Sequence, residues 1–70
     1  MTLTGTLRLL DLEGGTWLLL ADDGRRFQLD PPPQGHASGE RVEVDGDPEP
    51  ARMSFQMAAP LLRLRGIRRR

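Results

Sequence analysis

Few residues of this chain could do chemistry, and their types and spacing exclude most enzyme classes. His36 is the only histidine and there is no cysteine, so a zinc site of His and Cys ligands cannot be built within one chain. A Ser-His-Asp triad would need His36 on a loop rich in Pro and Gly, where we expect an exposed residue instead. Asp22 and Asp23 beside Gly24 are typical of a hairpin turn, because the spaced ligands of an EF-hand loop are missing. The sequence therefore predicts no enzyme and no catalytic, metal-binding or cofactor-binding residue.

Basic residues gather near the C-terminal end and are the remaining candidates for a site. The formal net charge is zero, but residues 1–50 carry ten acids against four arginines, whereas residues 51–70 carry six arginines and no acid. Such asymmetry is typical of an end that binds nucleic acid, where arginines follow a phosphate backbone. It is equally typical of one strand whose outward arginines pair with acids on neighbouring strands. The candidate nucleic-acid-binding residues are Arg63, Arg65, Arg68, Arg69 and Arg70.

The elements that must position these residues are strands, because apolar side chains recur with period two along the chain. Glycine-marked reversals separate the alternating segments, and no stretch has helical spacing over ten residues. The strand-like segments are residues 3–9, 16–21, 25–29, 41–46 and 52–57.

Prolines mark the connections between these strands. Three consecutive prolines at 31–33 predict a connection, since proline cannot donate to a ladder. The segment 47–51, "DPEPA", is expected to be a second loop. Pro60 leaves 61–67 as a sixth strand or as the continuation of the fifth after a bulge. We predict an all-β domain over residues 1–67, a barrel of five or six antiparallel strands, followed by a basic tail at 68–70.

The register of the hairpin around Gly24 decides whether Trp17 is a core residue or an exposed stacking platform. A two-residue turn would place Trp17 and Leu19 on the face of Arg26 and Gln28. A three-residue loop, with Gly24 at positive φ, pairs Leu19 with Phe27 instead and collects the larger apolar area on one face. We favour the second register, in which Trp17 is buried and Leu18 and Leu20 lie outside the core or against a partner. The predicted core is Leu3, Leu7, Leu9, Trp17, Leu19, Phe27, Leu29, Val42, Val44, Phe55 and Leu64.

The segment "LTGTLRLLDLEGGTWLLLADDGRRFQL", the Gly39 turn, "RVEVDG" and a final apolar strand together resemble the short bacterial OB-fold-like domains of unknown function. The resemblance covers residues 3–67 and implies an OB-like barrel. The chain departs from many OB-folds because "PPPQGHASG" leaves no room for a helix between the third and fourth strands. An SH3-like barrel is therefore the alternative architecture. The resemblance implies no site residues.

Binding is the function class that remains. A small chain without cysteine gains stability from good turns, a closed sheet or self-association, which makes a homodimer a candidate. We expect a cytoplasmic, non-enzymatic binding or assembly module, with single-stranded nucleic-acid binding through the C-terminal arginines as the alternative, and neither a cofactor nor a membrane partner. A protein partner or second copy would use adaptable apolar side chains near the C-terminal edge. These are Met53, Met57, Leu61 and Leu62.

Overall fold

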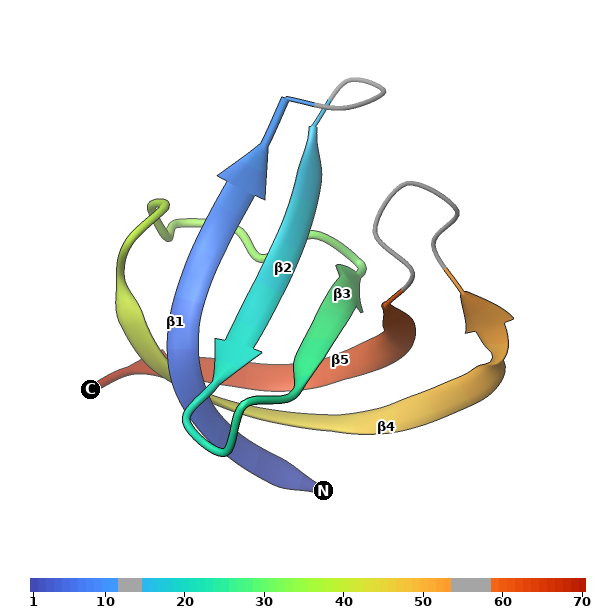
Figure 1. Cartoon of the computed structure of the whole chain (residues 1–70). Helices are drawn as coiled ribbons and strands as arrows, with labels where there is room; N and C mark the ends of the chain where they lie inside the picture. Colours follow the sequence, from blue (N-terminus) through green and yellow to red (C-terminus); the bar gives the residue numbers. More distant parts are fainter. Residues whose placement is uncertain (12–14, 54–58) are drawn as a thin grey trace.

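The protein forms a closed β-barrel of five strands in the computed structural model, which describes residues 1–11, 15–53 and 59–70, with only the backbone at 50–53 (Figure 1). The order of strands around the barrel is β1-β2-β3-β5-β4, closed by pairing of β1 with β4. No helix is present among the described residues, so the all-β prediction is confirmed. The strands are β1 Thr2–Leu10, β2 Thr16–Ala21, β3 Arg26–Asp30, β4 Arg41–Met53 and β5 Pro60–Arg69.

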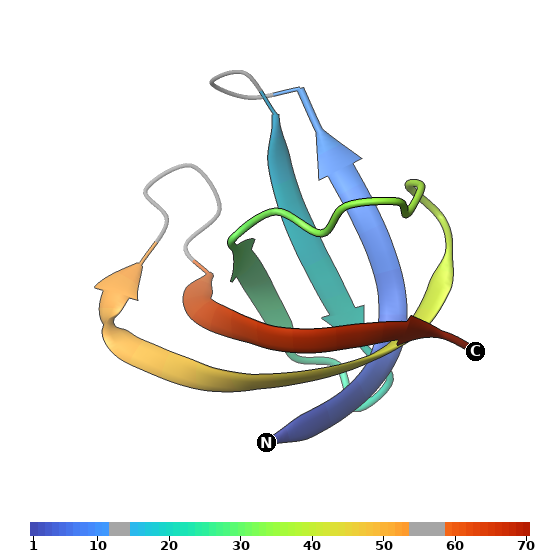
Figure 2. The same ribbon diagram turned by 180° about the vertical axis from the view of Figure 1, so that it is seen from behind.

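One pair of neighbouring strands departs from the antiparallel prediction. β3 and β5 run parallel, with Gln28 opposite Leu61 and Leu29 opposite Leu62. The other four pairs are antiparallel. A parallel pair needs a long crossover, and here the crossover includes the 31–40 connection and β4 (Figure 2). The barrel is therefore mixed, and its strand order is compatible with an OB-like arrangement.

The hairpin between β2 and β3 has the predicted register. Leu19 lies opposite Phe27, and Gly24 has a φ of +93°. The Gly24 N–H donates to the Ala21 carbonyl at 3.0 Å, and the Ala21 N–H donates to the Arg25 carbonyl at 2.9 Å. These bonds are those of a three-residue loop with a glycine bulge. The loop therefore places Phe27 and Leu19 on the same, inner face.

β4 continues through the segment expected to be a loop, and that expectation is wrong. The strand pairs with β5 through Glu49 and, after a register shift, again where Met53 lies opposite Pro60; Pro48 lies opposite Leu62. β1 pairs with β4 only up to Asp45, so beyond that residue the other edge of β4 has no partner strand in the part of the chain that the structure describes. The Gly46 N–H points to that edge and donates to the Met1 carbonyl at 2.9 Å. Pro48, two residues further, turns its donor-free nitrogen toward the same edge, where a sheet tolerates proline.

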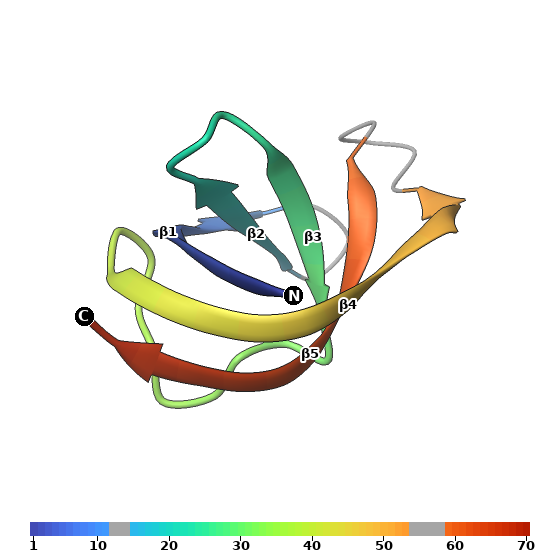
Figure 3. The same ribbon diagram turned by 90° about the horizontal axis from the view of Figure 1, so that it is seen from below.

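Two positions in the barrel wall are glycine because the backbone of the neighbouring strand lies too close for a side chain. A Cβ on Gly46 would lie 2.7 Å from the Arg63 carbonyl oxygen, where the register of β4 against β5 shifts. A Cβ on Gly5 would lie 2.9 Å from the Ala21 Cα, so β1 and β2 can approach only without a side chain there. β4 and β5, which approach each other at Gly46, curve around the barrel (Figure 3).

Most of the predicted core is confirmed. The buried cluster inside the barrel contains Leu3, Leu7, Leu19, Ala21, Phe27, Leu29, Val42, Val44 and Leu62. Trp17 and Leu64 are only partly buried and pack against this cluster, and Ile67 joins them. Leu9 is 44% exposed, so its assignment to the core is wrong: it has the inward parity but lies where β1 runs past the end of the barrel. Phe55 lies outside the described residues.

Two leucines on the outer face are buried as well. Leu18 is 3% exposed and Leu61 7% exposed, although neither belongs to the inner cluster. Leu18 was expected to lie outside the core or against a partner. It does lie outside the inner cluster, but other residues of the same chain already bury it. Leu61 and Leu62 are both buried, which removes them from the apolar surface predicted near the C-terminal edge. The side chains of Met53 and Met57 lie outside the described residues.

Candidate binding surfaces

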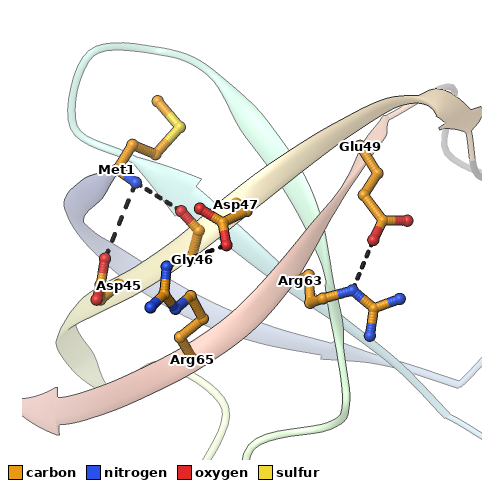
Figure 4. Close-up of polar contacts among 7 residues, drawn as sticks. All are labelled: Met1, Asp45, Gly46, Asp47, Glu49, Arg63 and Arg65. Carbon is orange, nitrogen blue, oxygen red and sulfur yellow. Dashed lines mark hydrogen bonds and ion pairs between the residues drawn. The ribbon is translucent and has the colours of Figure 1, made fainter.

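The five C-terminal arginines lie along β5 and at its end, and each forms an ion pair with an acid at or before β4. Arg63 Nε lies 2.6 Å from Glu49 Oε1, and an Arg65 terminal nitrogen (Nη1) lies 3.2 Å from Asp47 Oδ2 (Figure 4). The remaining pairs are Arg68 Nε with Glu43 Oε1 at 2.6 Å, Arg69 Nε with Glu40 Oε2 at 3.2 Å, and Arg70 with Glu43 at 4.0 Å.

The register of β4 against β5 produces this ladder. Glu43 lies opposite Arg68 and Asp47 opposite Arg63, and alternation turns the odd-numbered acids of β4 to the outside. Opposite charges facing each other across an antiparallel pair stabilise it modestly. Glu49 raises the pKa of Arg63, chiefly through the hydrogen bond between them. Of the two interpretations of the charge asymmetry, the structure therefore shows the strand with acids on its neighbour.

β5 also continues past the boundary expected between domain and tail. Arg68 and Arg69 lie in the strand, opposite Glu43 and Val42, and only Arg70 follows it. The five arginines are exposed, so their ion pairs stabilise the fold little. The pairs do lower the net positive charge of the strand, because each cation already has an anion within 4.0 Å.

His36 is not the exposed loop residue that was expected. Its side chain is 9% exposed, and its Nδ1 bonds to Glu40 Oε1. Arg69 closes the network, since it contacts Glu40 and also donates to the Gly35 carbonyl at 2.6 Å. The pKa of Glu40 is lowered, first by the bond from His36 and then by Arg69. This network attaches the 31–40 connection to β5. The single histidine of the chain therefore has a structural role in this network.

The end of the barrel between β1 and β2 exposes apolar side chains. Leu9 lies opposite Trp17, and these two line an open hollow of about 380 Å³ together with Leu10, Asp11 and Gly15. Apart from Met1 at the terminus, Leu9 is the only large apolar side chain exposed among the described residues. The 31–40 connection contacts Leu9 through Ser38, whose Oγ accepts from the Leu9 N–H at 3.0 Å, and no residue of this connection is among the described residues that line the hollow. This apolar end is a candidate contact surface that the sequence prediction placed in the core.

Two other arginines differ from those of β5. Arg8 and Arg26 are exposed and have no ion pair or side-chain hydrogen bond among the described residues, whereas Arg25 pairs with Asp23 and Arg41 with Asp22. Both project from the outer face, Arg8 opposite Leu18 and Arg26 opposite Leu20. Sequence reasoning missed them because it followed the density of arginine along the chain. The correctly predicted hairpin register was the available signal, because it already set Arg26 opposite a leucine.

The described residues contain no group of three or more His, Cys, Asp or Glu side chains that could hold a metal ion. Within those residues no helix is long and apolar enough to cross a membrane. Comparison with protein-family models, with curated proteins and with solved structures gives no match to this chain.

Proposed function

We propose that the protein is a non-enzymatic assembly module that contacts a second copy of itself through the apolar end. The observation that carries this proposal is the 44% exposure of Leu9 beside the partly buried Trp17. A 70-residue domain buries little apolar area per residue and commonly gains stability from oligomerisation. A two-fold contact brings the same patch of both subunits together, so Leu9 and Trp17 of each copy can cover those of the other.

The parallel β3–β5 pair favours an OB-like over an SH3-like barrel, and OB-like barrels commonly bind single-stranded nucleic acid. The C-terminal arginines are nevertheless a poor site for it. A phosphate backbone would have to compete with the acids that Arg63, Arg65 and Arg68 already contact. Base stacking would need exposed rings, whereas of the aromatic residues that the structure describes Phe27 is buried and Trp17 is partly buried against the core.

Sedimentation equilibrium over a range of concentrations tests the proposal. The wild-type mass is expected to rise above the 7.8 kDa of one chain, and Leu9→Ser is expected to weaken association by more than about tenfold, because each copy loses a buried leucine. Leu20→Ser is the matched control, since Leu20 is half-buried on the outer face of β2. Its association should match that of the wild type.

A mass of one chain at all concentrations would contradict assembly. The nucleic-acid alternative is tested in the same samples with an added oligothymidylate. If the oligonucleotide binds at low salt and Arg65→Ala with Arg68→Ala abolishes binding, the C-terminal arginines are the functional surface instead.

A further inference from the structure

We propose that the outer face of β1, β2 and β3 binds an acidic segment of another protein through Arg8 and Arg26. This surface lies outside the apolar end, and the inference does not depend on self-association. It rests on the distribution of charge over the folded chain, in which these two arginines alone among the described ones lack an acidic partner.

The two guanidinium groups belong to one surface. Arg8 on β1 and Arg26 on β3 flank β2 diagonally, because Arg8 lies opposite Leu18 and Arg26 lies opposite Leu20. Two strand spacings and a two-residue offset place their Cα atoms about 12 Å apart. By the alternation of side chains along their strands, both arginines point to the outer face of the sheet, and both are exposed.

Among the described residues, the surface between them offers contacts but no competing anion. The outward positions of β1 and β2 carry threonines, leucines and Arg8, with no acid. Leu20 and Gln28 are half-buried and lie beside Arg26 and Leu18, respectively. The nearest acid on the first three strands is Asp30, at the far end of β3 opposite Arg63. Asp22 is held by both terminal nitrogens of Arg41 at 2.7 Å, so it does not neutralise this face.

The spacing of the two cations fits carboxylates on an extended polypeptide. Residues on one side of a strand recur every ~7 Å, so acids two to four positions apart are within reach of two flexible arginine side chains. When the two acids are four positions apart, the residue midway between them lies on the same side of the segment and would rest on the exposed part of Leu20. A protein segment with two acids four positions apart and an aliphatic residue midway between them therefore matches both the charge and the apolar character of the face.

Nucleic acid fits the same face less well. Trp17 and Phe27, the aromatic residues of β2 and β3, have the inward parity and pack with the core. The face therefore offers no ring for a base to stack on. Two cations would neutralise about two phosphates, which gives weak affinity at physiological salt.

The proposal is tested by fluorescence anisotropy at low salt with a fluorescein-labelled peptide whose glutamates lie four positions apart, with a leucine midway between them and serine at the other positions. We expect binding that weakens about threefold in Arg8→Gln and in Arg26→Gln, and about tenfold in the double variant. Arg65→Gln is the matched control, since it removes one charge from an exposed arginine on β5. It should change the affinity less than twofold, and near-UV circular dichroism should show all variants folded.

Four results would overturn the proposal. They are absence of binding to the wild type, equal binding of a peptide with glutamine in place of glutamate, equal weakening by Arg65→Gln, and tighter binding of an oligothymidylate that the double variant loses. The last would assign the face to nucleic acid. Because Leu9 is not part of this face, Leu9→Ser should bind the acidic peptide as the wild type does, so failure of self-association and failure of this proposal are separate results.

Discussion

Replacing Gly5 by alanine should strongly destabilise the barrel. Gly5 is buried opposite Ala21, and a Cβ there would lie 2.9 Å from both the Ala21 Cα and the Leu20 carbonyl carbon, with the Leu20 oxygen closer still. Carbon atoms in contact prefer a separation of about 3.5–4.0 Å, so β1 and β2 would have to separate by roughly 0.5–1 Å. All the obstructing atoms are backbone atoms, which cannot move aside as a flexible side chain can.

The expected loss of unfolding free energy is about 3 kcal/mol, the upper part of the range for overpacked sites. A chain of this length is stabilised by about 4–10 kcal/mol in total, so the variant would keep between a quarter and two thirds of it. Urea unfolding followed by circular dichroism measures the change. With a slope of about 1 kcal/mol per molar urea, the midpoint should fall by about 3 M.

Gly66→Ala is the matched control, because nothing lies within 4 Å of a Cβ at Gly66 and its φ is outside the left-handed region. It should be neutral or stabilise the protein by about 0.5 kcal/mol. If Gly5→Ala unfolded within about 0.5 M of the wild type, or Gly66→Ala cost as much as Gly5→Ala, the close approach of β1 and β2 would not be a constraint on the fold.

Four further variants test other parts of the structure. Gly24→Ala should lower the unfolding free energy by about 1 kcal/mol in thermal denaturation, because its φ of +93° strains an L side chain; an unchanged midpoint would contradict the bulged loop. Leu19→Ala, at a side chain with no exposed surface, should cost about 3 kcal/mol in urea, whereas Leu9→Ala should cost under about 1 kcal/mol. His36 and Arg69 lower the pKa of Glu40, so its ionised form stabilises the fold above the ordinary pKa of 4.5, and this stability is lost as the pH falls below that value. Glu40→Gln should therefore reduce the dependence of the unfolding free energy on pH in the acid range. An unchanged dependence would exclude the His36–Glu40–Arg69 network as its cause.

Local sequence signals predicted the features that local chemistry determines. Strand periodicity and the glycine at position 24 were sufficient for the pairing of Leu19 with Phe27, since a one-residue slip would have turned the apolar set to the solvent. The parallel pairing of β3 with β5 joins segments separated by more than thirty residues, and no turn chemistry encodes such a contact. Pro48 was interpreted as a loop signal because the sequence does not show that one edge of β4 lacks a partner.

The candidate sites were harder to predict than the fold, for a related reason. Whether Arg63 or Arg68 is available to a ligand depends on which residues stand opposite it, and that follows from the register of β4 against β5. One of the two interpretations of the sequence, outward arginines paired with acids on neighbouring strands, is correct. Nothing in the sequence alone distinguished it from a nucleic-acid-binding end. Leu9 has the alternation of a core residue, and only the place where the barrel ends exposes it.

The unpartnered edge of β4 has a consequence for aggregation. An exposed strand edge can template the addition of strands from other molecules and so start fibrous assembly. Along this edge the Gly46 N–H is already used by the Met1 carbonyl, and Pro48 has no hydrogen to donate. An incoming strand would therefore find two successive donor positions closed, and Pro48→Thr, which restores one donor, should shorten the lag before thioflavin-positive fibrils appear under mildly destabilising conditions.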